Sequence, residues 1–428
     1  MIKCGMSEVD ITPKLGLSIP GYLNLRNATG VKDELFAKAM VFADEKMVAG
    51  LVAIDALDLE LDDVIRIRKR VYQLTRIEEE NIMVCLTHTH TGGPVVNSFV
   101  TKRDEEYITY LINKAADAVI LAYNKMQPVR IGSGKGFVDD ISFNRRYFMK
   151  DGSVKTNPGK LNLMIEKPAG PIDTDVMVIK VENMEGNIIG AIVNFACHLD
   201  VVGGNEYSAD YAGELVKVLK SLYGEDLITL FLNGISGNIN HINTNTKERK
   251  SIFHYKKMGR ILAGETVKVL TKINCEENIR VDSKKEVLSI PLRRVAEEEL
   301  MKAQQEMKSE NTSEIDKVFA NEVLEFNKNK VGSTDVEAQV LRIGSTTITG
   351  FPGDVFVEFG LRVKKESPFE YNVVSSHTNG RNGYIPIKEA FTQGGYEVRT
   401  TRSNKLAHEA GDMITEAVLR VMGELKKF

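Results

Sequence analysis

Residues 81–94 read Asn-Ile-Met-Val-Cys-Leu-Thr-His-Thr-His-Thr-Gly-Gly-Pro, an apolar run that ends in two histidines and a turn-forming Gly-Gly-Pro. The run predicts a buried strand that opens into a loop at His88 and His90. Side chains two residues apart on an extended backbone share one face, so both imidazoles can reach one point in space. Neutral imidazole is a common metal ligand. The segment therefore fits a metal site and, equally, a pair of surface histidines at a turn.

Strand-like apolar runs recur along the 428 residues, and amphipathic helical patterns lie between many of them. Residues 188–196, for example, are followed by a helical pattern over residues 212–223. This alternation predicts an α/β fold with a mixed central β-sheet flanked by helices. Residues 290–333 interrupt it with two charge-rich helical segments, which we interpret as a helical hairpin insertion with a solvated outer face.

The composition is ordinary for a globular protein: 43% of the residues are hydrophobic, 27% are charged, and the formal net charge is −3. No basic cluster stands out, which argues against a nucleic-acid partner. No apolar run approaches the roughly 18–20 residues of a transmembrane segment, and the N-terminus lacks the apolar region of a signal peptide. The four cysteines lie far apart with no CxxC spacing. We therefore expect a reduced, cytoplasmic protein, and the sequence does not indicate its oligomeric state.

Two further apolar runs end in residues that bind metals. Residues 188–196 lead into His198, and residues 347–351 lead into Asp354. Sites in open α/β sheets form outside the carboxyl ends of the strands, so we expect both residues to converge with His88. Two imidazoles and a carboxylate are the ligand set of a catalytic zinc ion that keeps one position open. Taken singly, His198 fits a structural role and Asp354 fits a helix cap.

These segments together resemble the catalytic domain of the neutral/alkaline non-lysosomal ceramidase family. The shared motifs are, in order, Val9-Asp-Ile-Thr-Pro13, Thr87-His-Thr-His-Thr-Gly92, Asn194-Phe-Ala-Cys-His198, Ser208-Ala-Asp-Tyr-Ala-Gly213, Gly237-Asn-Ile-Asn240, Pro352-Gly-Asp354 and Gly383-Tyr-Ile-Pro386. Each motif is short, but the series extends over nearly the whole chain. The resemblance implies a single catalytic domain over residues 1–428, without the C-terminal β-sandwich domain that accompanies full-length ceramidases.

The resemblance also implies one zinc ion (Zn²⁺) held by two histidines, a carboxylate and a tyrosine. These ligands fall on His88, His198, Asp354 and Tyr384. The family has a glutamate where this chain has Asp354, so the ligand arm is shorter by one methylene group. Three further polar residues match residues that line the family's site, namely His90, Arg145 and Tyr396.

One departure concerns a serine of the family that is implicated in catalysis. The alignment places Asn240 at its position, and a shift that recruits Ser236 spoils the register of the glycine-rich motif. Asparagine is not a nucleophile, although its amide can donate a hydrogen bond to an oxyanion. A covalent serine mechanism is therefore not expected.

We expect a zinc-dependent hydrolase in which metal-activated water cleaves the amide bond of a small or lipid-like N-acyl substrate, with ceramide as one candidate. His90 is the leading candidate for proton transfer to the leaving group, and a contact that fixes the loop is its alternative role. Arg145 and Tyr396 would orient the substrate or stabilise developing charge, with Asn240 as an added donor. A structural salt bridge is the alternative for Arg145.

Two other functions fit the same residues. One is a zinc-dependent ester or lactone hydrolase. The other is a catalytically inactive ligand-binding or scaffold descendant, which the residues Asn240 and Asp354 favour and the two histidines, Tyr384 and Arg145 oppose.

Several residues outside the proposed ligand set are assigned provisional roles. Asp10 is a candidate acceptor for the free N–H of a metal-bound imidazole. His241 neighbours the glycine-rich loop and is a candidate to face the site. The remaining histidines are assigned structural roles by default, although His377 lies just upstream of a turn-forming Asn379-Gly380.

Overall fold

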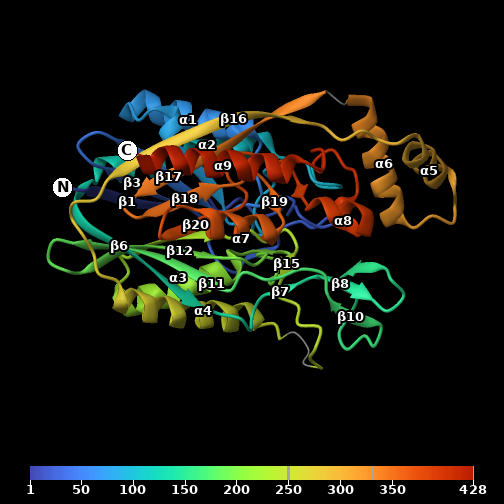
Figure 1. Ribbon diagram of the computed structural model, residues 1–428, viewed down its shortest axis with the longest axis horizontal. Coiled ribbons are helices and arrows are strands. Elements are labelled where there is room, and N and C mark those ends of the chain that lie inside the picture. Colours follow the sequence, from blue (N-terminus) through green and yellow to red (C-terminus); the bar gives the residue numbers. More distant parts are fainter. Residues whose placement is uncertain (248–250, 330–331, 428) are drawn as a thin grey trace.

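The structure, a computed structural model, describes residues 1–247, 251–329 and 332–427 (Figure 1). Its largest element is an eight-stranded mixed sheet in the order β14-β12-β11-β6-β1-β3-β4-β5. Neighbouring strands are antiparallel except for β12 with β14 and β4 with β5. The strands of this sheet are β1 (Lys3–Asp10), β3 (Phe36–Ala43), β4 (Val48–Ile54), β5 (Ile82–Leu86), β6 (Gln127–Phe137), β11 (Asp175–Asn183), β12 (Ile188–Phe195) and β14 (Ile228–Asn233).

A second, four-stranded sheet packs on one face of the first. Its strands, in spatial order, are β16 (Val281–Pro291), β17 (Ser333–Ile343), β18 (Thr346–Gly350) and β20 (Tyr371–Ser375). The core between the sheets includes Met83 and Cys85 of β5 and Ile348 and Val373 of the second sheet. The expected mixed α/β fold is confirmed, but a sheet rather than helices covers this face.

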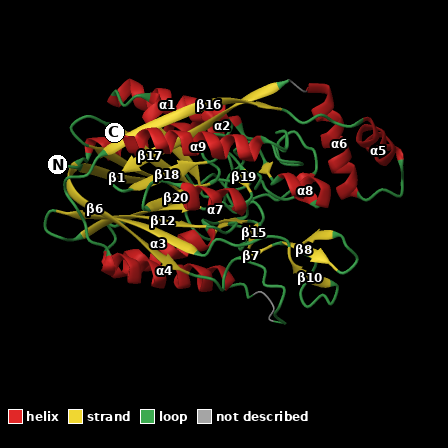
Figure 2. Cartoon of the chain, viewed as in Figure 1, coloured by secondary structure: helices red, strands yellow, loops and turns green. Residues whose placement is uncertain are grey.

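Helices cover the two outer faces. Ile82 and Val84 of β5 face the helices, whereas Met83 between them faces the second sheet, as strand alternation requires. A strand buried on both faces reads as a continuous apolar run. The helices over the first sheet are α1 (Leu61–Thr75), α2 (Glu105–Asn124), α3 (Asp210–Tyr223) and α4 (His254–Lys272). Those over the second sheet are α7 (Val357–Glu366) and α9 (Ala410–Lys427) (Figure 2).

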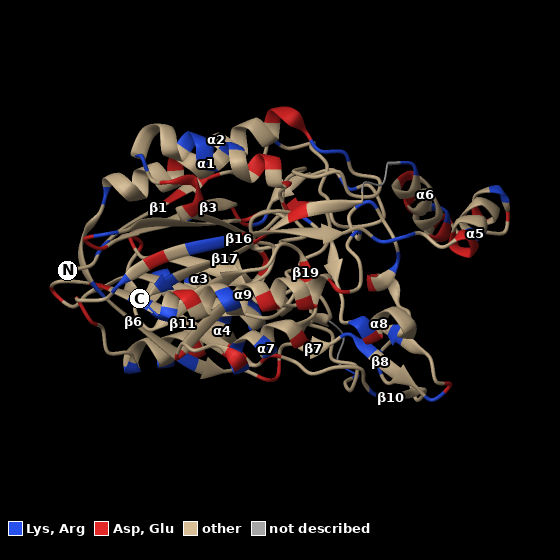
Figure 3. Cartoon of the chain, turned by 45° about the horizontal axis from the view of Figure 1, so that its top comes forward, with Lys and Arg blue, Asp and Glu red and all other residues tan. Residues whose placement is uncertain are grey.

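Helices α5 (Glu297–Lys308) and α6 (Glu314–Asn329) are the pair expected within residues 290–333. They pack on each other through Ala303, Ala320 and Val323, and they lie at the end of the molecule away from both termini (Figure 1). Charged residues of both signs are interspersed over the helices (Figure 3). No helix within the described ranges combines the length and apolar character that a membrane crossing needs.

Short elements lie between the long strands and helices along the chain. They are β2 (Gly30–Val31) with β13 (Glu206–Tyr207), β7 (Phe143–Asn144) with β15 (Ile239–Asn240), β19 (Asp354–Val355) with β21 (Tyr384–Ile385), the sheet of β8 (Arg146–Met149), β9 (Val154–Thr156) and β10 (Ile165–Pro168), helix α8 (Lys388–Gln393), and 3-10 turns at Glu79–Asn81 and Tyr396–Val398.

Candidate metal centre

Two histidines enter the site from the ends of strands β5 and β12. His88 has a left-handed backbone, with φ of 64°, and its Nδ1 lies 2.8 Å from the carbonyl oxygen of Leu57. His198 Nδ1 lies 2.9 Å from the carbonyl oxygen of Ser236. A carbonyl oxygen only accepts hydrogen bonds, so Nδ1 carries the hydrogen in both rings and Nε2 keeps its lone pair. Both imidazoles are therefore held in the tautomer that binds a metal through Nε2.

The backbone of Asp354 is held by close glycine contacts. Asp354 pairs with Tyr384 in the parallel β19–β21 ladder, and its N–H donates to Gly383 O at 2.8 Å. A Cβ atom at Gly353 would lie 2.5 Å from Gly383 O, and one at Gly237 would lie 2.3 Å from Asp354 O. The Pro-Gly-Asp and Gly-Tyr motifs thus let the chain approach closely enough to place this carboxylate beside the histidines.

The three side chains meet at one buried point. Asp354 Oδ1 lies 3.3 Å from His198 Nε2 and 3.5 Å from His88 Nε2. Asp354 Oδ1 and His198 Nε2 have no hydrogen-bond partner in the described part of the chain. Ligand atoms at about 2.0–2.1 Å from a tetrahedral zinc ion lie about 3.3–3.4 Å apart. The observed separations therefore fit a single small cation.

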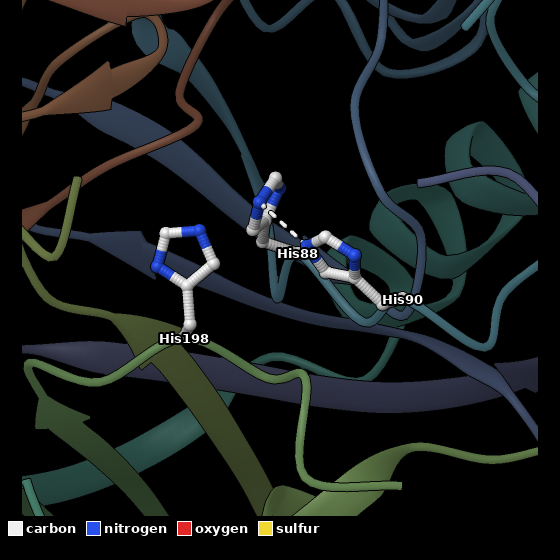
Figure 4. A group of neighbouring side chains, drawn as sticks. All are labelled: His88, His90 and His198. Atoms are coloured by element: carbon white, nitrogen blue, oxygen red, sulfur yellow. Dashed lines mark hydrogen bonds between the residues drawn. The ribbon is translucent and has the colours of Figure 1, made fainter. Parts of the chain in front are cut away.

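A third imidazole lies next to this group. His90 Nε2 is 3.3 Å from His88 Nε2, and the N–H of His90 donates to Leu199 O at 3.0 Å, which ties the two histidine loops together. Figure 4 shows the rings of His88, His90 and His198 gathered around one point. Gly21 packs against His90, where a Cβ atom would lie 2.7 Å from His90 Nδ1.

Tyr384 and Tyr396 form a polar wall beside the histidines. Their hydroxyl oxygens are 2.9 Å apart, and the Arg145 guanidinium lies 5.3 Å and 5.1 Å from the centres of their rings. Arg145 Nε is 3.2 Å from Glu397 Oε1, and its Nη2 donates to Gly237 O at 2.5 Å. Arg145 thus makes the salt bridge considered as its alternative role and also faces the site.

A cavity of about 580 Å³ is lined by His88, His90, Arg145, His198, Asp354, Tyr384 and Tyr396. Its apolar lining includes Leu23, Phe99, Ile315 and Phe319, the last two from α6. Cavities of this size hold small organic ligands. A larger groove of about 1080 Å³ lies over β6, but no histidine or cysteine is among the described residues that line it.

Burial and neighbouring charges shift the pKa of His88, His90 and Asp354. Burial lowers the pKa of His90 to about 4 and, with His377 nearby, lowers that of His88 well below its usual range. Burial alone would raise the pKa of Asp354, but His88, His377 and His198 hold it well below its usual range. Neutral imidazoles beside an ionised carboxylate are the forms that bind a cation.

The metal-free protein is expected to lose stability in acid, in part through His90. A histidine whose pKa is lower in the folded state contributes its full stability above its unfolded pKa of about 6.5, and this stability falls as the pH drops towards the folded pKa of about 4. Replacing His90 by glutamine removes this contribution, so between these pH values the wild-type protein should lose up to about 3 kcal/mol more unfolding free energy than His90→Gln. Denaturant unfolding at several pH values measures the difference. Parallel pH curves for the two proteins would contradict the prediction.

Asn240 and Asp10, which the sequence assigned to the site, are not among the described residues that line the cavity. The amide Nδ2 of Asn240 donates to Asn157 Oδ1 at 2.7 Å, and its Oδ1 accepts from the Ile242 N–H at 2.9 Å. The expectation for Asp10 is wrong: it is exposed and accepts from the Thr12 N–H, because backbone carbonyls already accept the Nδ1 hydrogens of His88 and His198.

His377, for which the sequence indicated a structural role, lies beside the candidate ligands, and Asp58 and Asp200, which the sequence did not indicate, line the cavity. His377 Nε2 is 3.6 Å from Asp354 Oδ1, and His377 Nδ1 is 3.1 Å from Asp58 Oδ1. Asp200 lines the cavity and accepts a hydrogen bond from Tyr22. The available signals were weak: a histidine next to a turn, and aspartates just after the apolar runs that contain β4 and β12.

Residues 2–210 match the model of the neutral/alkaline non-lysosomal ceramidase N-terminal domain. Neutral ceramidases B and A of Dictyostelium discoideum are 24% identical to this chain over 206 and 201 residues, which are 45% and 44% of this chain. The matched parts span only 28% and 26% of those relatives.

Solved structures share the fold over the whole chain. The crystal structure of neutral ceramidase from Pseudomonas aeruginosa aligns with a TM-score of 0.75, over 99% of this chain and 75% of that chain, at 16% identity. A ceramidase complexed with C2 aligns with a TM-score of 0.76, over 100% of this chain and 75% of that chain, at 15% identity. At these identities the likeness concerns the fold.

Proposed function

Because the chain belongs to the neutral/alkaline non-lysosomal ceramidase family, we propose that it is a zinc-dependent hydrolase that cleaves the amide bond of an N-acyl substrate. One observation supports this proposal above all others. His198 Nε2 and Asp354 Oδ1 are buried 3.3 Å apart without a hydrogen-bond partner among the described residues. Leaving buried polar atoms unpaired is costly, and a cation between them removes that cost.

His88, His198 and Asp354 would hold the ion, and Tyr384 is the proposed fourth ligand. When bound, zinc supplies Lewis acidity, which polarises a carbonyl and lowers the pKa of a water towards about 7. The backbone carbonyls of Leu57 and Ser236 keep the two imidazoles oriented for this task.

His90 is proposed to move the proton. Since burial lowers its pKa to about 4, the ring is neutral at neutral pH and its lone pair is free to accept a proton. The ring can hold a proton taken from the attacking water and deliver it to the leaving nitrogen. Gly21 permits this position, because a larger residue there would displace the ring.

Arg145 and Tyr396 are proposed to stabilise the negative charge that develops on the substrate oxygen. Burial raises the pKa of Tyr396 above its usual range, although Arg145 acts in the opposite sense, so its hydroxyl remains a protonated donor. Arg145 is fixed by Glu397 and Gly237 and adds a positive charge behind this hydroxyl. Preorganised donors of this kind stabilise an oxyanion. Asn240 is given no reacting role, because its amide is bonded to Asn157.

The cavity supports a substrate with an apolar portion. Leu23, Phe99 and Phe319 offer an apolar surface that an acyl chain or another small apolar group can cover. A small or lipid-like N-acyl compound therefore fits the site, and the ceramide implied by the names of the relatives is one such compound.

The test is to measure bound zinc in the purified protein and to assay N-acyl, ester and lactone substrates before and after chelation. We expect amide hydrolysis that chelation abolishes and added zinc restores. Hydrolysis of esters or lactones alone would replace the amidase assignment. A protein that binds zinc and turns over none of the substrates would favour the non-catalytic descendant, and one that zinc neither activates nor stabilises would refute the proposal.

A further inference from the structure

His377 lies beside the candidate metal centre and is not one of the proposed ligands. It follows strand β20, and 1% of the residue is exposed. Its Nε2 lies 3.6 Å from Asp354 Oδ1 and has no hydrogen-bond partner within the described ranges. A buried polar atom that faces a carboxylate in this way points to a role at the site.

Two consecutive residues hold His377 and His88 face to face. The carbonyl oxygen of Leu57 accepts from His88 Nδ1 at 2.8 Å, and the carboxylate of Asp58 accepts from His377 Nδ1 at 3.1 Å. The two rings stack with centroids 3.6 Å apart and an interplanar angle of 13°. The backbone of Leu57 thus orients the ring of His88, and the side chain of the next residue, Asp58, orients the ring of His377.

The backbone of His377 joins two segments that carry proposed ligands. Its carbonyl oxygen accepts from the Leu86 N–H at 3.1 Å, two residues before His88. Its own N–H donates to Gly353 O at 3.4 Å, next to Asp354. A change in the position of His377 is therefore transmitted to both the histidine loop and the carboxylate.

The stacking argues against His377 as a second imidazole ligand of the same ion. A metal binds in the plane of an imidazole ring, at about 2.0–2.1 Å from the nitrogen. Because the two rings are nearly parallel and 3.6 Å apart, an ion in the plane of His88 lies well outside the plane of His377. His377 Nε2 instead faces the same carboxylate oxygen as His88 and His198.

We propose that His377 and Asp58 act together as positioning residues that fix the carboxylate of Asp354 for metal binding. The proposal rests on the metal centre of the proposed function. Asp354 Oδ1 has no hydrogen-bond partner among the described residues, so the orientation of this carboxylate depends on the imidazoles that face it. Outer contacts that orient metal ligands typically contribute 10- to 100-fold to metal affinity.

The test measures zinc affinity by competition with a chelator, and the ligand field by the absorption spectrum of the cobalt-substituted protein. His377→Phe keeps an aromatic ring against His88 but removes both nitrogens. We expect it to weaken zinc binding about 10- to 100-fold and to alter the cobalt spectrum, while His198→Ala removes binding altogether. His377→Gln, which keeps a polar group near Asp354, should recover part of the affinity.

Substitutions of Asp58 provide a second test of the proposed pair. Asp58→Ala should weaken zinc binding in the same direction as His377→Phe, and Asp58→Asn, which still offers an acceptor oxygen, should weaken it less. Because both residues act through one chain of contacts, the double variant Asp58→Ala/His377→Phe should bind zinc no more weakly than His377→Phe alone. His408→Phe is the matched control, since His408 is about half exposed and pairs with Glu409 on the surface, and its zinc affinity should equal that of the wild type.

Three results would overturn the proposal. They are unchanged zinc affinity and cobalt spectrum in His377→Phe, loss of metal as complete as in His198→Ala, which would make His377 a ligand, and simple additivity in the double variant. If His377→Phe fails to fold, as thermal unfolding of the metal-free form would show, unchanged affinity in Asp58→Ala is the refuting result. A wild-type protein that binds zinc but hydrolyses no substrate would refute the proposed function alone, since these readouts do not use turnover.

Discussion

His198→Ala is expected to lose bound zinc and to lower kcat/KM for an N-acyl substrate by at least about 1,000-fold, equivalent to about 4 kcal/mol of transition-state stabilisation. His198 Nε2 is buried 3.3 Å from Asp354 Oδ1 and has no hydrogen-bond partner within the described ranges. The substitution therefore removes one of the proposed ligands of the ion. Metal analysis and steady-state kinetics measure both effects.

His198 is a cleaner position for this test than His88. His88→Ala would also remove the ring that stacks on His377 and the hydrogen bond from His88 Nδ1 to Leu57 O, so it would disturb the neighbouring residues as well as remove a ligand. His408→Ala is the control, because His408 is a surface residue paired with Glu409 and should keep full zinc and activity. Turnover that survives in His198→Ala would move the catalytic centre elsewhere.

Chelation is expected to lower the unfolding free energy of the wild-type protein by about 4 kcal/mol when free zinc would otherwise stand at about 1,000 times its dissociation constant. The reason is that the ion binds the folded chain, in which strand ends far apart in sequence bring His88, His198 and Asp354 together. Thermal unfolding with and without chelator measures the shift in Tm.

The same experiment on His198→Ala supplies the control. This variant should unfold at one temperature whether or not zinc is present, because it has lost the site. The assignment of the ligands would be contradicted if chelator left the Tm of the wild type unchanged. It would also be contradicted if zinc raised the Tm of His198→Ala as much as that of the wild type.

Much of the fold and part of the site follow from the sequence because strands leave local signals. The apolar run of β5 and the two histidines after it locate one wall of the site, and the same reasoning reaches His198 and Asp354. The second sheet could not be foreseen in this way. Met83 and Cys85 have to be apolar whether a helix or a sheet covers them, so the pattern of β5 does not distinguish the two.

The contacts that orient the ligands depend on packing between distant segments. Asp58 meets His377 across 319 positions of sequence, and Asn240 meets Asn157 across 83. No motif or spacing in the sequence predicts either contact. The acceptors for the histidine Nδ1 atoms are backbone carbonyls, which every residue possesses. The sequence therefore contains no signal that favours these carbonyls over a carboxylate such as Asp10.

The most direct test of the central claim is the anomalous diffraction of crystals grown with zinc. The account predicts one strong peak about 2.0–2.2 Å from His88 Nε2, His198 Nε2 and an oxygen of Asp354. A peak at other residues, or no peak at this position in crystals soaked with excess zinc, would contradict it.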